Sequence, residues 1–175
     1  MNTAVIDDPN TTEANAWWFL DTLVIEHRRA PGMRSVVFEM MLPVGHAPAM
    51  HVHDDIDDTW YVIDGQMALR CGENEYVAEP GVWVSLPRGV PHSFRVVGDR
   101  PARIIVVHDN HSFLDFVAEL GEPTDQRVPP PNPKFPSIEE LGRVAHDHDL
   151  APVGPPMSEE LAQAIIARAR QSVPA

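Results

Sequence analysis

The chain has 175 residues, of which 43 % are hydrophobic, which suits one domain with a buried core. Its net charge of −13 repels the phosphates of nucleic acids and the headgroups of anionic membranes. No stretch approaches the roughly 20 apolar residues of a membrane span, and no basic segment followed by an apolar one marks a signal peptide. Cys71 is the single cysteine, which excludes an internal disulfide. We therefore expect a cytoplasmic protein that binds neither nucleic acid nor membrane.

The N-terminal part predicts an arm followed by strands. Residues 1–16 are polar and predict a lightly attached arm. Residues 17–26 are aromatic and β-branched with rough alternation, and predict one strand. The adjacent Trp17 and Trp18 point to opposite faces of such a strand, so one packs on the core and the other on an edge or a partner chain. Residues 34–42 predict the next strand.

The middle of the chain predicts short strands separated by closely spaced turns. Asp64-Gly65 is a strong hairpin signal between the first two of them. Many short strands at this spacing are typical of an all-β sandwich or barrel. The predicted strands cover residues 58–63, 66–71, 75–78, 82–86, 92–97 and 102–108.

The pattern becomes helical after residue 109. Residues 112–120 carry apolar side chains at helical spacing. Ser137 and Glu140 form a capping box and predict a helix that ends near residue 146. Between them lies a Pro-rich, extended crossing. We expect an irregular segment and then a final helix, over residues 149–157 and 158–170.

Three histidines and a carboxylate lie near the starts of predicted strands. His51 and His53 are two residues apart, so on a strand both rings point to one face. Asp58 opens one aromatic, β-branched run and His92 opens another. Imidazole and carboxylate ligands suit iron, nickel, copper, manganese or zinc. We therefore expect one divalent transition metal per chain.

The stretch around the first two histidines resembles the first motif of the cupin superfamily. That motif is a glycine, His-x-His, a glutamate and a second glycine at fixed spacing. Gly45, His51, His53 and Gly65 match it, and Asp58 stands where the motif has its glutamate.

The stretch before His92 resembles the second cupin motif, which is a glycine, Pro-x-Gly, a histidine and an asparagine. Gly81, Pro87, Gly89 and His92 match it, and Val96 stands where the motif has its asparagine. The resemblance implies an all-β, double-stranded β-helix barrel that holds the metal inside, with a short helical C-terminal extension. The Pro-rich stretch after the barrel more weakly resembles the quercetin-dioxygenase-like single cupins.

We expect three parts packed as one domain. These are an N-terminal arm and first strand, the cupin barrel, and a helical and Pro-rich C-terminal extension, over residues 1–32, 33–108 and 109–175.

Asp58 has three possible roles. Its side chain is one methylene shorter than that of the motif glutamate, and carboxylate–metal bonds are about 2.0–2.2 Å long. It binds the metal directly, acts through water or as a neighbouring base, or is only a loop carboxylate. The first two roles make it the candidate catalytic residue.

Apolar residues are expected to line the cavity. Trp60, Val62 and Phe94 share strand parity with the ligands, so they point toward the metal. Phe38 and Met40 join them or fill the outer face of the sheets. An apolar cavity suits a hydrophobic or aromatic substrate.

Other polar residues are expected to take no part in metal binding or catalysis. His108 lies at the exit of the last predicted strand, where we expect a surface or capping role. Asp54, Asp55 and Asp57 predict a solvated acidic loop.

Three alternative functions are consistent with these residues. The resemblance favours a quercetinase-like dioxygenase acting on an aromatic or enolic small molecule, with Asp58 as the base toward a substrate hydroxyl. The same site suits a non-redox isomerase, cyclase or lyase that uses the metal as a Lewis acid. The third function is a small-molecule-binding cupin without turnover. Exposed edge strands and the aromatic N-terminal segment favour a homodimer.

Overall fold

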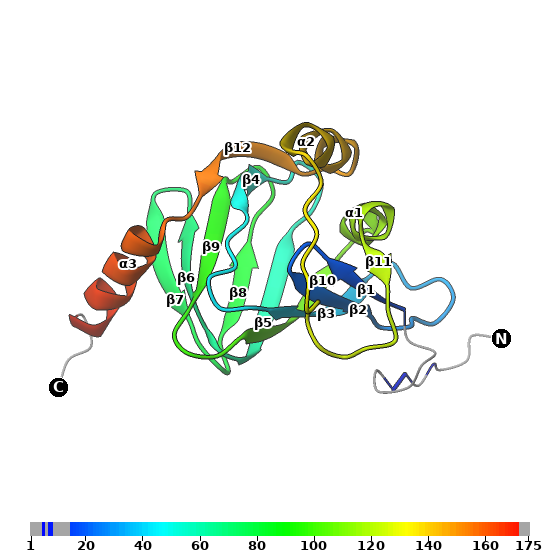
Figure 1. Ribbon diagram of the computed structural model, residues 1–175, viewed down its shortest axis with the longest axis horizontal. Coiled ribbons are helices and arrows are strands. Elements are labelled where there is room, and N and C mark those ends of the chain that lie inside the picture. Colours follow the sequence, from blue (N-terminus) through cyan, green and yellow to red (C-terminus); the bar gives the residue numbers. More distant parts are fainter. Residues whose placement is uncertain (1–4, 6, 9–14, 172–175) are drawn as a thin grey trace.

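Two antiparallel β-sheets face each other and three helices lie at their margins (Figure 1). The computed structural model describes residues 5, 7–8 and 15–171. The arm expected over residues 1–16 therefore falls mostly outside the described residues. The expected all-β architecture with a short helical C-terminal part is confirmed.

The larger sheet has seven strands, and its centre is the pair β3 and β10. In spatial order the strands are β11 (Glu122–Pro123), β1 (Ala16–Phe19), β2 (Thr22–Glu26), β3 (Val36–Leu42), β10 (Ala102–His108), β5 (Asp58–Asp64) and β8 (Trp83–Leu86).

The smaller sheet has five strands and carries His51 and His92. In spatial order its strands are β12 (Ala151–Pro156), β4 (Ala49–Val52), β9 (His92–Val97), β6 (Gln66–Cys71) and β7 (Asn74–Ala78).

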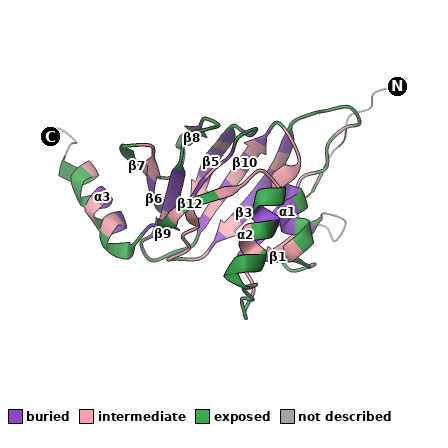
Figure 2. Cartoon of the chain, turned by 90° about the horizontal axis from the view of Figure 1, so that it is seen from above, coloured by how far each residue is buried: buried purple, intermediate pink, exposed green. Residues whose placement is uncertain are grey.

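The core lies between the sheets because the strands alternate. In β10, Ala102, Ile104, Val106 and His108 are buried, while the residues between them are partly exposed. Full burial of one such apolar side chain stabilises the fold by about 1.5–3 kcal/mol. In Figure 2 buried residues recur along the strands of both sheets, whereas exposed residues dominate the outer sides of the helices.

The three helices cover the sheets from outside. They are α1 (Ser112–Leu120), α2 (Ile138–Asp147) and α3 (Glu159–Gln171). α1 and α2 add side chains to the main core cluster, whereas α3 packs on Ala68 and Val97 of the smaller sheet. The expected capping box is confirmed, since the Ser137 hydroxyl accepts a hydrogen bond from the Glu140 N–H at 3.1 Å. Among the described residues, no helix combines the length and apolarity that crossing a membrane requires.

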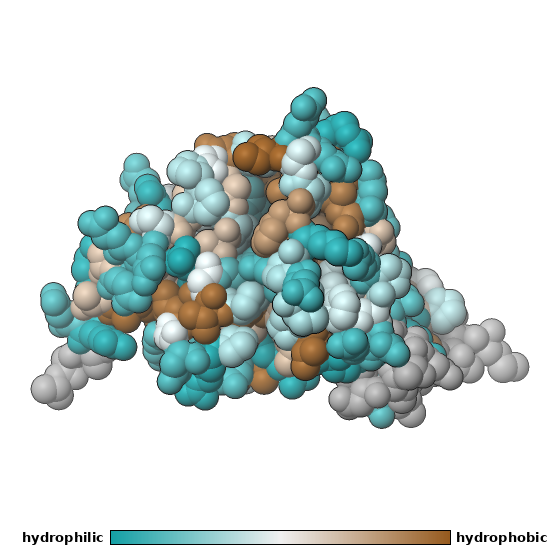
Figure 3. All heavy atoms as spheres, viewed as in Figure 1, coloured by the Kyte–Doolittle hydropathy of each residue, from teal (hydrophilic) through white to brown (hydrophobic). Residues whose placement is uncertain are grey.

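Hydrophilic side chains dominate the outer surface of the helices. On the face shown in Figure 3, hydrophobic side chains form separate patches between hydrophilic ones.

Two predicted elements differ from the structure. Residues 17–26 form a hairpin of β1 and β2 instead of one strand, because Leu20 takes a positive φ of 56° at the turn. The segment expected to be irregular forms β12, which pairs with β4. Its prolines, Pro152, Pro155 and Pro156, lack N–H donors, and they are tolerated because β12 is an edge strand with one neighbour.

Candidate metal centre

Three histidines converge between the two sheets. His51 on β4 and His92 on β9 are direct cross-strand partners, and His53 follows β4 by one residue. All three side chains are buried. One nitrogen of each ring lies within 4.8 Å of the others, so the cluster could hold one metal ion.

The hydrogen bonds of these rings select the nitrogen that faces the centre. The Nδ1 atoms of His51 and His53 lie 2.8 Å from the carbonyl oxygens of Ala49 and Asp149. Nδ1 of His92 lies 3.0 Å from the carbonyl oxygen of Val90. A carbonyl oxygen only accepts, so each Nδ1 must carry the proton and donate it. In its neutral form, each ring therefore keeps an unprotonated Nε2 for a metal.

Burial and neighbouring charge favour the uncharged forms of His51 and His53, which are the forms that bind a cation. Burial lowers the pKa of His51 to about 4, and the neighbouring His92 adds to this effect. Burial also lowers the pKa of His53. Nε2 of His92 is buried without a hydrogen-bond partner among the described residues. A buried lone pair without a donor is the arrangement that a transition metal satisfies, so these residues fit the expected metal.

Asp58 lies beside the histidines at the start of β5. Its Oδ1 accepts hydrogen bonds from Nε2 of His108 at 2.9 Å and from Nε1 of Trp60 at 2.5 Å. Its Oδ2 lies 3.9 Å from Nε2 of His92. Burial acts to raise the pKa of Asp58, but the hydrogen bond from His108 and the nearby histidines outweigh it and lower that pKa. Asp58 is therefore an ionised carboxylate, and its oxygens do not belong to the three-nitrogen group.

The surface or capping role expected for His108 is wrong. The side chain is 3 % exposed and points into the barrel. The alternation of β10 explains this, because His108 has the same parity as the buried Ile104 and Val106. That parity was the signal available in the sequence.

Asp149 is a site residue that the sequence analysis missed. Its carbonyl oxygen orients His53, and its carboxylate accepts the N–H groups of Asp54 and Asp55 at 3.1 and 2.9 Å. The residue has a positive φ of 62° and lies 96 positions after His53. No local pattern in the sequence links two segments so far apart.

The acidic loop is exposed but ordered by one arginine. The Arg88 guanidinium donates to the carboxylates of Asp55, Asp57 and Asp109. This link joins the loop that follows His53 to the turn that precedes His92.

The five side chains expected at the cavity wall all belong to the main core cluster. Trp60 and Phe94 pack edge to face with ring centroids 5.0 Å apart, and Phe38 lies 5.1 Å from the His108 ring. The members of this group are Phe38, Met40, Trp60, Val62 and Phe94.

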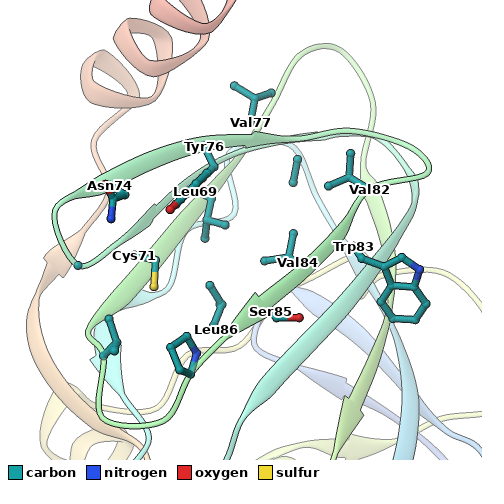
Figure 4. Close-up of a pocket in the computed structure, with 14 residues that line it drawn as sticks. Leu69, Cys71, Asn74, Tyr76, Val77, Val82, Trp83, Val84, Ser85 and Leu86 are labelled. Carbon is teal, nitrogen blue, oxygen red and sulfur yellow. The ribbon is translucent and has the colours of Figure 1, made fainter.

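A pocket of about 510 Å³ lies next to this cluster, between β6, β7 and β8 (Figure 4). Its apolar wall includes Leu69, Val84 and Leu86, with Cys71 beside them. Each of these residues is the cross-strand partner of a residue named above. The pairs are Leu69 with Phe94, Cys71 with His92, Val84 with Trp60, and Leu86 with Asp58. The pocket is thus one strand away from His92 and Asp58.

Part of the chain is similar to known proteins. The family model described as "Cupin domain" matches residues 38–108. The chain is 29 % identical over 87 residues to quercetin 2,3-dioxygenase of Bacillus subtilis, a match that covers 50 % of this chain and 26 % of that protein. It is 22 % identical over 74 residues to an uncharacterized protein of Methanocaldococcus jannaschii, covering 42 % of this chain and 59 % of that protein. The chain thus spans less than two thirds of either relative.

A solved structure shares the fold. KdgF from Halomonas sp. superposes with a TM-score of 0.54 at 12 % identity, covering 64 % of this chain and 99 % of that chain. Sequence identity this low supports a shared fold and no shared function. The family match shows that residues 38–108 form a cupin domain, and the two motifs within it meet at His51, His53 and His92.

Proposed function

We propose that the chain is a metal-dependent dioxygenase that acts on an aromatic or enolic small molecule. The observation that carries this proposal is the convergence of three Nε2 lone pairs beside the buried, ionised Asp58. Iron, nickel, copper, manganese or zinc bound by His51, His53 and His92 would supply Lewis-acid chemistry, and the first four would also supply redox chemistry. The distant relationship to quercetin 2,3-dioxygenase supports the oxidative alternative.

In this proposal Asp58 handles the proton of the substrate. Its Oδ1 is occupied by two donors, so Oδ2 is the oxygen with capacity to accept a substrate hydroxyl. Removal of that proton converts an enol or phenol into the anion that reacts with an oxidant. The buried environment excludes water, which would otherwise compete for the carboxylate.

The adjoining pocket supports an apolar substrate. Its volume of about 510 Å³ lies within the usual range for small-molecule sites, which is about 300–1,000 Å³. Leu69, Val84 and Leu86 give it an apolar wall, and the Trp60 and Phe94 rings lie on the neighbouring strands. A flat, largely apolar molecule with one acidic hydroxyl suits both the wall and Asp58.

Oxygen consumption tests the proposal. The metal-free protein is loaded separately with Fe²⁺, Mn²⁺, Ni²⁺, Cu²⁺ and Zn²⁺ and mixed with flavonols and simple enols in an oxygen electrode. We expect oxygen uptake with at least one redox metal and ¹⁸O from ¹⁸O₂ in the product, both lost in His92→Ala. Product formed without oxygen uptake would replace the proposal with the non-redox enzyme. Substrate binding without product for every metal would replace it with the binding protein.

A homodimer is also proposed. β7 and β8 are edge strands, and Trp83 on β8 is 61 % exposed. Pairing of such an edge with a second copy would cover it. Light scattering on the purified protein is expected to give twice the mass of one chain, and the mass of a single chain would contradict the proposal.

A further inference from the structure

One oxygen of Asp58 receives two hydrogen bonds from buried donors. The indole Nε1–H of Trp60 can only donate, and His108 Nε2 approaches the same Oδ1 at 2.9 Å. A carboxylate oxygen accepts, so His108 Nε2 is the donor of this second hydrogen bond. Nδ1 of His108 is buried without a hydrogen-bond partner among the described residues, so Asp58 is the polar contact that fixes this ring.

Apolar packing holds both donors in place. His108 lies edge to face against Phe38 and Phe113, with ring centroids 5.1 and 5.8 Å apart. Trp60 is 3 % exposed and packs on Phe94. If Asp58 turned away, two buried N–H groups would lose their acceptor, which is unfavourable in a buried site. The packing therefore opposes any rotation of the carboxylate.

The held carboxylate is not grouped with the three histidine nitrogens. The three histidine nitrogens form one group in which all atoms lie within 4.8 Å of one another, and the Asp58 oxygens are outside it. Oδ2 comes within 3.9 Å of His92 Nε2, so it lies beside the centre. The short aspartate side chain cannot extend further while its Oδ1 stays bound to Trp60 and His108.

We propose that His108 and Trp60 hold Asp58 outside the coordination sphere, so that His51, His53 and His92 are the only protein ligands of the metal. This inference rests on the proposed function in taking a metal to be bound at the histidines. His108 is then a positioning residue that acts through Asp58. The site keeps one more open coordination position than a site with three histidines and a carboxylate.

The absorption spectrum of Co²⁺ tests this arrangement, because its visible bands depend on the number and type of ligands. The metal-free full-length protein and its variants are titrated with Co²⁺. Asp58→Asn is expected to leave the bands at the wild-type positions and intensities. His108→Leu frees the carboxylate to bind, so its bands should shift and weaken as the coordination number rises. The double variant His108→Leu with Asp58→Asn should restore the wild-type spectrum.

Two controls separate positioning from general damage. His108→Gln keeps an N–H donor near the same place and should retain the wild-type spectrum, whereas His92→Ala should weaken Co²⁺ binding more than about 100-fold because a ligand is lost. Circular dichroism checks that each variant is folded. If His108→Leu does not fold, the Asp58→Asn spectrum still tests whether the carboxylate is a metal ligand.

Other results would overturn the inference. A changed spectrum in Asp58→Asn would show a direct carboxylate–metal bond, and an unchanged spectrum in folded His108→Leu would show that His108 does not restrain Asp58. These failures differ from failure of the proposed function. No Co²⁺ binding by the wild type would remove the metal site itself, whereas no oxygen uptake with the expected spectra would remove only the dioxygenase.

Discussion

At the scale of single residues, Asp149 ties the C-terminal part of the chain to the candidate metal centre. Its carbonyl oxygen fixes the tautomer and orientation of His53, and its carboxylate binds two N–H groups of the loop that follows. Ligand orientation by such partners usually contributes 10- to 100-fold to metal affinity. The residue therefore acts on the centre without touching a metal.

Replacement of Asp149 tests that role. We expect Asp149→Ala to lower the free energy of unfolding by about 2 kcal/mol, because two N–H groups lose their acceptor and alanine is strained at positive φ. Zn²⁺ affinity should fall about 10-fold as His53 loosens. Asp149→Asn, which tolerates positive φ and keeps one acceptor, should show smaller losses. Urea unfolding and a Zn²⁺ titration measure both effects, and equal losses in the two variants would contradict the account.

A second residue-scale prediction concerns pH. The Glu39 hydrogen bond raises the pKa of His27, and the same contact, with Arg103, lowers the pKa of Glu39. The His27 contribution is therefore full below the unfolded histidine pKa of about 6.5 and is lost as pH rises through the raised folded pKa. The Glu39 contribution is lost as pH falls through its lowered pKa.

The expected difference in stability between the wild type and a His27 variant is small because His27 is partly exposed. His27→Gln should be less stable than the wild type by about 0.5 kcal/mol at pH 5.5, and the difference should vanish by about pH 9. Urea unfolding at the two pH values measures it. The same difference at both pH values would mean that charge on His27 is not involved.

At the scale of elements, the turn between β5 and β6 is fixed by a close backbone approach. Gly65 has a φ of +80°, and a Cβ there would lie 2.5 Å from Cα of Ala102 and 2.6 Å from the carbonyl oxygen of Pro101. The turn at the end of β5 is therefore in close contact with the start of β10. Asp58 lies on β5 and His108 lies on β10.

Gly65→Ala is expected to destabilise the fold by about 3 kcal/mol, because backbone must shift as well as φ. Gly98 provides a matched control, since its φ is +89° but a Cβ there meets nothing within 4 Å. Gly98→Ala should cost only the conformational strain, about 1 kcal/mol. Thermal unfolding compares the two variants. Equal losses would show that the close approach at Gly65 has no energetic effect.

Most strands of the barrel could be predicted from the sequence because their signals are local. Alternation and turn residues gave the strands over residues 58–108 to within one residue at each end. Leu20 and β12 could not be predicted in this way. A leucine carries no turn signal, and a Pro-rich strand is recognised only when its neighbour β4 is known.

At the scale of the whole molecule, the candidate centre joins segments from distant parts of the chain. Motif spacing identified His51, His53 and His92, because their parity and turns are encoded nearby. Two residues that orient the site, Asp149 beside His53 and His108 beside Asp58, come from the C-terminal extension and the end of β10. Such contacts depend on how the two sheets and the extension close, which no local pattern encodes.

The most direct test of a metal centre at these histidines is the metal content of the purified, untagged protein. Elemental analysis after reconstitution is predicted to give close to one transition metal per chain in the wild type and in His111→Ala, a histidine that pairs with Glu26 and Asp115 instead. His92→Ala is predicted to lose it. A wild type that takes up no metal, or a His92→Ala variant that binds as much as the wild type, would contradict the account.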